Sequence, residues 1–207
     1  MPTILLTGFA PFGGSENNPS RQIAEHLHGE TVGGARVIGL TLPVVMGEDA
    51  DLLTAAIADH KPVLVLMLGL ATGATCIDVE RFAVNLRYTD LGDPAKPLEP
   101  NLPQSVVIAD GRAALFSTVD AERVAAAIST AGVPARAHGY AGAYACNHVF
   151  YQALHYAFQW EMRYRAGFLH LPLSSEQAVA ENKVHQPSLP LDTLILGVRA
   201  ALEKALL

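Results

Sequence analysis

Short apolar runs along the chain predict strands, and longer runs with apolar residues three or four positions apart predict helices. The predicted strands cover residues 3–7, 36–42, 63–68, 77–86, 134–138 and 167–172. The predicted helices cover residues 48–60, 119–131 and 191–207, and two more begin near residues 19 and 146. Because strands and helices alternate, we predict an α/β fold: a three-layer α/β/α sandwich around a twisted, largely parallel (mixed) sheet. Residues 1–207 should form a single domain.

Several of these elements carry residues that favour a helix end. Asn18 is a good N-cap, and Pro19 suits the first helical position. Ser117 and Asp120 are spaced as a capping box for the helix 119–131, and Gly132 should end it. The helix 48–60 places its apolar residues on one face: Leu52, Leu53, Ala56 and Ile57.

The predicted strand 77–86 changes its apolar register in the middle. Ile77 and Val79 alternate with acidic residues, whereas a second apolar series begins at Phe82. Such a slip predicts a β-bulge, a feature often found beside active sites, and Glu80 lies next to it. The alternative for Glu80 is an ordinary exposed acid on a strand.

Two Gly-rich loops follow predicted strands. The first, residues 8–14, carries Phe9 and Phe12 at a place where open α/β sheets build functional loops. It lacks the Gly-Lys-Ser/Thr ending of a phosphate-binding loop, and the alternative is that both rings anchor it in the core. Residues 69–73 form the second loop, expected at the same sheet edge. The Pro-rich stretch 88–107 is typical of a lid, a binding loop or an oligomer contact.

The composition restricts the setting of the protein. Half of the residues are hydrophobic and only 16% are charged, which is enough for a large core. A net charge of -6 without a basic run argues against nucleic-acid partners. The longest apolar run, residues 63–71, is too short to span a bilayer, and the first residues lack a signal-peptide pattern. With two cysteines and no disulfide framework, we expect a cytoplasmic protein with no membrane association.

Cys146 is the first candidate for chemistry. Small residues precede it, and a helical apolar pattern that includes Val149, Phe150 and Ala153 follows it. A thiol in the first turn of a helix meets unpaired N–H groups and the positive end of the helix dipole, which favour the thiolate. The alternative is a buried, inert cysteine.

Cysteine-dependent hydrolysis also needs an imidazole and a group that orients it. Of the eight histidines, His170 is best placed, because it stands at the C-terminal end of a predicted strand. His138 ends another predicted strand near Cys146 and is the weaker candidate. A single histidine is more often structural than catalytic, so position alone leaves the assignment open.

Six segments of the chain form a recognisable series. They are LTGFAPFGG with NPS (6–14, 18–20), LPVV (42–45), VERFAVN (79–85), DG with FST (110–111, 116–118), AG with CNH (141–142, 146–148) and AGFLHLP (166–172). In this order they resemble the segments of pyroglutamyl peptidase I, or pyrrolidone-carboxylate peptidase, a family of cysteine exopeptidases. Each segment alone is weak, but six in the right order are specific.

The resemblance implies an enzyme that hydrolyses the N-terminal pyroglutamyl residue from peptides, without a cofactor, as a homotetramer. It makes Cys146 the nucleophile, His170 the acid/base and Glu80 the residue that orients His170. It also implies a substrate slot formed by Phe9, Phe12, Asn18, Leu70, Tyr144 and Ala145. Cys76 matches no nucleophile motif, and we see no metal-ligand spacing in the chain.

The chain departs from the family's usual sequence in three places. Leu70 stands where the family usually has Gln, Tyr144-Ala145 replaces Phe-Val, and Leu173 replaces Tyr. The alternative function is therefore a catalytically weak or repurposed relative that binds or hydrolyses a related lactam or small amide.

Overall fold

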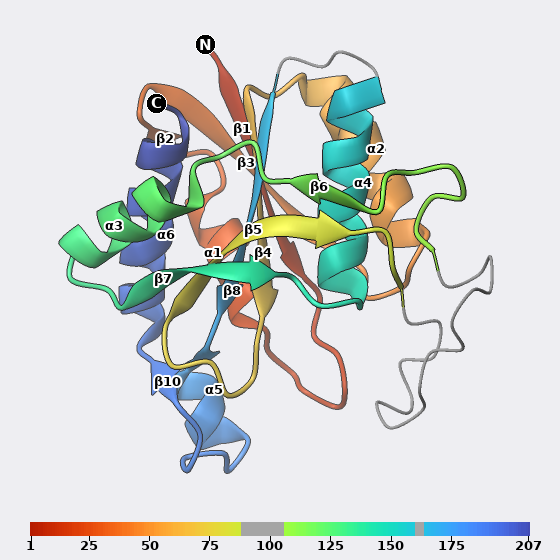
Figure 1. Cartoon of the computed structure of the whole chain (residues 1–207). Helices are drawn as coiled ribbons and strands as arrows, with labels where there is room; N and C mark the ends of the chain where they lie inside the picture. Colours follow the sequence, from red (N-terminus) through yellow and green to blue (C-terminus); the bar gives the residue numbers. More distant parts are fainter. Residues whose placement is uncertain (88–105, 160–163) are drawn as a thin grey trace.

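A central sheet organises the protein in the computed structural model, which describes residues 1–87, 106–159 and 164–207. Within these residues the sheet has eight strands in the order β2-β3-β1-β4-β8-β5-β6, and β7 pairs with β5 (Figure 1). The strands are β1 (Thr3–Phe9), β2 (Thr31–Val32), β3 (Ala35–Leu42), β4 (Leu64–Leu70), β5 (Ile77–Val84), β6 (Ala114–Phe116), β7 (Ala135–Tyr140) and β8 (Arg165–Leu171). The predicted Pro-rich loop lies outside the described residues, apart from its last two positions.

Helices cover both faces of this sheet (Figure 1). They are α1 (Pro19–Leu27), α2 (Glu48–His60), α3 (Ala121–Thr130), α4 (Ala145–Gln159), α5 (Ser175–Ala180) and α6 (Leu191–Ala205). A small second sheet pairs β9 (Leu173–Ser174) with β10 (Ser188–Leu189). None of the helices in the described ranges is long and apolar enough to cross a bilayer.

The core has two halves, one on each face of the sheet. Leu6 and Leu66 pack with α1, α3 and α6, whereas their neighbours Leu5 and Val65 pack with α2 and α4. Successive residues of a strand point to opposite faces, so β1 and β4 are apolar on both sides. The predicted three-layer α/β/α sandwich in one domain is thereby confirmed.

The sheet is mixed, as predicted. Strands β3, β1, β4 and β8 run parallel, whereas β5 is antiparallel to β8 and parallel to β7. The C-terminal ends of β1, β4 and β8 therefore meet at one edge, the lower end in Figure 1. Gly69 and Leu70 belong to β4 rather than to the predicted loop, because Gly69 pairs in register with His170.

Some helix ends follow the prediction and some do not. Asn18 is the N-cap of α1 and its side chain accepts the Ser20 N–H, as predicted. The capping box predicted at Ser117 is wrong. Helix α3 begins at Ala121, and its N-cap is Asp120, whose carboxylate accepts the Arg123 N–H. The Ser117 hydroxyl accepts the Val119 N–H, ahead of the first helical residue.

The apolar face predicted for α2 is also partly wrong. Leu53 and Ile57 are fully buried, but Leu52 is 40% exposed. Asp49 is buried in its place, because its carboxylate accepts the N–H groups of Gly47 and Ala50 and meets the imidazole of His148 on α4. A polar contact between two helices therefore takes a position where the pattern suggested an apolar one.

The irregularity predicted in β5 is a change of neighbour. Asp78 and Val79 pair with β8, whereas residues from Phe82 onward pair with β6. Along the other edge, β5 keeps one register with β7 from Ile77 to Phe82. The predicted bulge is therefore wrong for the β5–β7 pair, and Glu80 lies where β5 leaves β8.

Candidate active site

Cys146 lies in the first turn of α4, as the sequence predicted. Its sulfur rests against the backbone of β4: a Cβ atom added to Gly69 would come within 2.7 Å of Cys146 Sγ. The same atom would approach the ring of Phe168 to 2.8 Å. Only glycine at position 69 leaves room for both side chains, so β4 fixes how deep the thiol sits.

Asn147 anchors the turn that carries the thiol. Its side-chain amide donates to the carbonyl oxygens of Val84 (2.8 Å) and Leu86 (2.9 Å), and its oxygen accepts the Val84 N–H (2.9 Å). These bonds tie the start of α4 to the end of β5, although the two lie far apart in the sequence. From the sequence, Asn147 stood out only as part of the CNH motif (residues 146–148), and its anchoring role was not predicted.

His170 lies between Glu80 and Cys146. Its Nδ1 is 2.7 Å from Glu80 Oε1, and its ring interacts with the Cys146 side chain. Burial opposes the charged ring, but the thiol and the carboxylate outweigh it and raise the pKa of His170 to about 10. The imidazole is therefore held in its charged form near neutral pH.

Glu80 is almost completely buried, with 1% of its surface exposed, and both of its oxygens are occupied. Oε1 meets His170, and Oε2 lies 2.9 Å from Nδ1 of His138 on β7. His138, the weaker of the two candidates from the sequence, therefore contacts the same carboxylate as His170. His148, two residues after Cys146, turns instead to Asp49 on α2.

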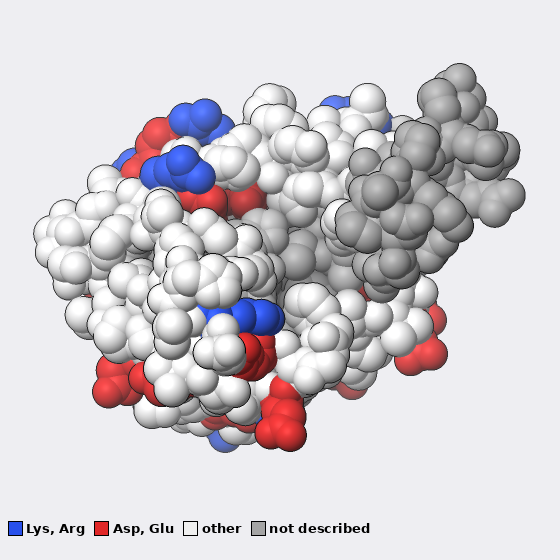
Figure 2. Space-filling model, turned by 90° about the horizontal axis from the view of Figure 1, so that it is seen from below, with Lys and Arg blue, Asp and Glu red and all other residues white. Residues whose placement is uncertain are grey.

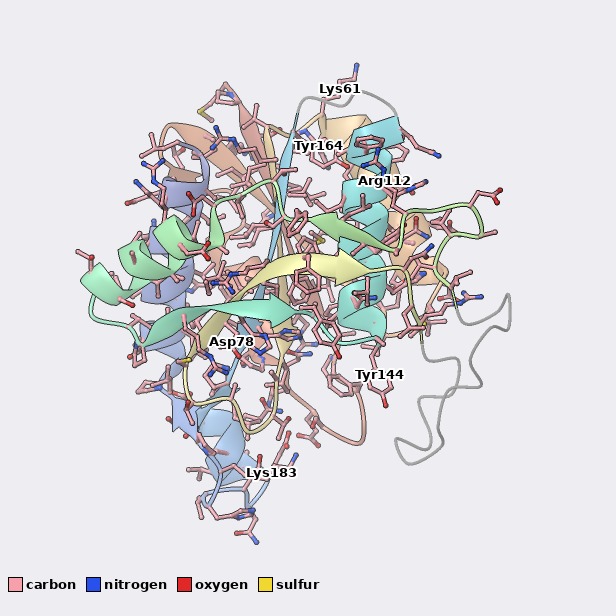
Figure 3. All side chains as sticks on the ribbon, viewed as in Figure 1. Lys61, Asp78, Arg112, Tyr144, Tyr164 and Lys183 are labelled. Atoms are coloured by element: carbon pink, nitrogen blue, oxygen red, sulfur yellow. The ribbon has the colours of Figure 1, made fainter. Side chains whose placement is uncertain are left out.

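A second polar pair lies one step along the same strands. Arg136 on β7 donates to both carboxylate oxygens of Asp78, at 2.6 and 3.2 Å (Figure 3 labels Asp78). Burial would raise the pKa of Asp78, but the guanidinium holds it below its usual range. Burial and this carboxylate raise the pKa of the Cys76 thiol, whose sulfur is 3.6 Å from Asp78 Oδ1. Cys76 is thus kept protonated, which is unsuited to a nucleophile.

Three of the residues predicted for a substrate slot, Phe9, Phe12 and Asn18, lie between the end of β1 and the start of α1. The Asn18 side chain donates to the Ala10 carbonyl oxygen and accepts a hydrogen bond from the Ser20 hydroxyl. That hydroxyl in turn accepts the Phe9 N–H, so these side chains hold the loop against α1. Phe9 is buried in the core under α2. Phe12 is 46% exposed, so its ring is free to meet a ligand.

Of the other predicted slot residues, Leu70 ends β4, Tyr144 stands just before α4 and Ala145 begins α4. Leu70 and Tyr144 are half-buried, and Ala145 is buried. Tyr144 points toward the lower end of the molecule, the end where the loop after β1 also lies (Figure 3). Seen from this end, most of the described surface is formed by residues other than Lys, Arg, Asp and Glu (Figure 2). An uncharged ligand group suits such a surface.

A thiol, an imidazolium and a buried carboxylate in this order are the groups that an acyl-transfer centre needs. The open N–H groups in the first turn of α4 are suited to stabilise negative charge on a carbonyl oxygen. The described part of the chain contains no group of three His, Cys, Asp or Glu side chains that could hold a metal ion.

Comparison with known proteins agrees with this chemistry. The sequence profile of the pyroglutamyl peptidase family matches residues 2–207. The chain is 38% identical to a pyrrolidone-carboxylate peptidase of Vibrio vulnificus over 96% of its own length and 90% of the relative's. It is similar to the crystal structure of Bacillus amyloliquefaciens pyroglutamyl peptidase I (TM-score 0.88, 31% identity, 100% and 97% coverage). A pyrrolidone carboxyl peptidase from Thermococcus litoralis matches with a TM-score of 0.90 (31% identity, 100% and 94% coverage).

Proposed function

The chain belongs to the pyroglutamyl peptidase family of cysteine-type hydrolases, and from this premise we propose how it cleaves its substrate. The enzyme removes the N-terminal pyroglutamyl residue from peptides with a Cys146–His170–Glu80 triad. One observation carries the proposal: His170 contacts the Glu80 carboxylate and the Cys146 thiol at the same time.

The first half of the reaction uses the ion pair. The Cys146 thiolate attacks the carbonyl carbon of the pyroglutamyl residue, and a C–S bond forms while negative charge develops on the carbonyl oxygen. The N–H groups at the start of α4 stabilise that charge. His170 then gives its proton to the leaving amine, the C–N bond breaks, and a pyroglutamyl thioester remains on Cys146.

The second half restores the enzyme. Neutral His170 takes a proton from water, the water oxygen attacks the thioester carbon, and the C–S bond breaks to release free pyroglutamate and the thiolate. Glu80 stays ionised throughout and stabilises the imidazolium. Because Glu80 bonds the Nδ1 of His170, the other ring nitrogen is left for the thiol and the substrate.

The slot accounts for selectivity in the same proposal. The pyroglutamyl ring is an uncharged lactam with apolar faces, which suits contacts with Phe12, Leu70 and Tyr144 and polar contacts with main-chain groups. An ordinary amino terminus would bring an unpaired positive charge into this place, which is costly. Discrimination therefore comes from excluding a charge as much as from binding the lactam.

The test uses three matched fluorogenic amides with pyroglutamyl, prolyl and glutamyl groups. We expect rapid release of the fluorophore from the pyroglutamyl amide alone, because the prolyl and glutamyl groups carry a charged amine. Equal cleavage of the prolyl amide would contradict the slot, and no cleavage of the pyroglutamyl amide would contradict the proposed function. A homotetramer in the cytoplasm, acting on peptides, stays a prediction from the resemblance and the composition.

A further inference from the structure

Glu80 is shared by two histidines from opposite sides. In the parallel pairing of β5 with β7, Glu80 stands in register with His138, and the His138 Nδ1 lies 2.9 Å from Glu80 Oε2. His170 reaches the other oxygen, Oε1, from β8 at 2.7 Å. An ordinary triad needs only one of these rings, so the mechanism above leaves His138 without a function.

The two rings differ sharply in their access to solvent. The His170 side chain is 12% exposed and that of His138 is 41% exposed, while the Glu80 side chain between them is 1% exposed. A carboxylate oxygen buried this deeply needs a hydrogen-bond donor, and His138 supplies it for Oε2. At the same time, the His138 ring can exchange its proton with water directly.

The charged groups near this carboxylate are engaged with other partners. His170 faces it from β8 and is paired with Cys146 of α4. Asp78 of β5 and Arg136 of β7 are bonded to each other through two contacts, so their charges offset one another. His138 is the side chain that meets Glu80 Oε2.

We propose that His138 is a positioning residue for the hydrolysis: its ring holds the plane of the Glu80 carboxylate, so that Oε1 stays directed at Nδ1 of His170. This inference rests on the proposed function, because it acts through Glu80 and His170. His138 donates its Nδ1–H to Oε2 from one side, while His170 meets Oε1 from the other. Without the first contact the carboxylate can turn, and the support that it gives to the His170 imidazolium becomes weaker.

Two substitutions separate the hydrogen bond from the bulk of the side chain. His138→Asn can place an N–H donor where the His Nδ1 stands, and His138→Leu removes the donor altogether. We expect His138→Leu to lower kcat about tenfold with KM changed less than twofold, since a buried carboxylate oxygen loses its donor. We expect His138→Asn to keep most of the kcat, because its amide can still donate to Glu80 Oε2.

The control is His26→Asn, which removes an exposed histidine of α1 and should leave rate and profile unchanged. The rate of Cys146 alkylation by iodoacetamide, followed against pH in each variant, reports the ion pair without turnover. The inference is overturned if His138→Leu keeps the wild-type kcat, or if His138→Asn loses as much kcat as His138→Leu. A wild-type enzyme that leaves the pyroglutamyl amide intact refutes the proposed function instead, so the two failures are distinguishable.

Discussion

Replacing Glu80 with glutamine removes the charge that faces His170 while it keeps the shape of the side chain. Glu80 accepts a hydrogen bond from each of two rings, His170 at 2.7 Å and His138 at 2.9 Å. Glutamine has one carbonyl oxygen, so it can accept from only one ring and must donate to the other. His138 is the more exposed ring and can change its tautomer, so we expect the variant to fold.

The size of the effect follows from the buried contact. A hydrogen bond to a charged group stabilises by roughly 1.5–3 kcal/mol, and one pKa unit corresponds to about 1.4 kcal/mol. The pKa of His170, about 10 in the wild type, should therefore fall by roughly one to two units. Because this pKa is raised, the proton on His170 is present below it and is lost as the pH rises toward 10.

The assay is a pH–rate profile of the wild type, Glu80→Gln and Glu80→Asp with the pyroglutamyl amide. We expect kcat of Glu80→Gln to fall by roughly 10- to 100-fold with a smaller change in KM, because Glu80 contacts the histidine and not the substrate. Its alkaline limb should move to lower pH, and Glu80→Asp should be intermediate. A Glu80→Gln enzyme with wild-type kcat and an unmoved alkaline limb would refute the role of Glu80 and leave a Cys–His dyad.

Three further substitutions test how the site is held. Gly69→Ala should lower kcat roughly 100-fold, because its Cβ would stand 2.7 Å from the Cys146 sulfur. The control Gly139→Ala, whose Cβ would meet open space, should keep the wild-type kcat. Equal kcat values for the two variants would contradict the packing of Gly69 against Cys146. Asn147→Ala removes three hydrogen bonds to the backbone of Val84 and Leu86 and should lower the free energy of unfolding by about 3 kcal/mol in urea titrations. A loss below about 1 kcal/mol would mean that water replaces the amide side chain. Leu70→Gln should raise kcat/KM for the pyroglutamyl amide if an amide side chain helps to bind the lactam, and no gain would mean that the strand end has repacked around Leu70.

The sequence predicted the parts of the fold that depend on local patterns. The bounds of helix α2 and most of strand β4 were predicted correctly, because an amphipathic helix and a buried strand each impose their own period on the chain. Cys146 was placed in the first turn of a helix, and His170 near the end of a strand, for the same reason. Both positions follow from the residues that lie beside them in the sequence.

The contacts between distant segments could not be predicted in this way. The apolar pattern indicated an irregularity near Glu80, and we predicted a bulge there. Only the structure shows that β5 pairs first with β8 and then with β6. His138 competed with His170 for one role in the sequence. In the structure both rings meet one carboxylate, since the register between β5 and β7 decides which side chains touch.

The central claim is that Cys146 carries the pyroglutamyl group during the reaction, and covalent trapping tests it most directly. The measurement is inactivation by a pyroglutamyl chloromethyl ketone, followed by mass spectrometry of the labelled peptides in the wild type, Cys76→Ser and Cys146→Ser. The proposal predicts one label per chain on Cys146 in the first two proteins, loss of activity in step with labelling, and an inactive, unlabelled Cys146→Ser protein. A label on Cys76, or full activity in Cys146→Ser, would contradict it.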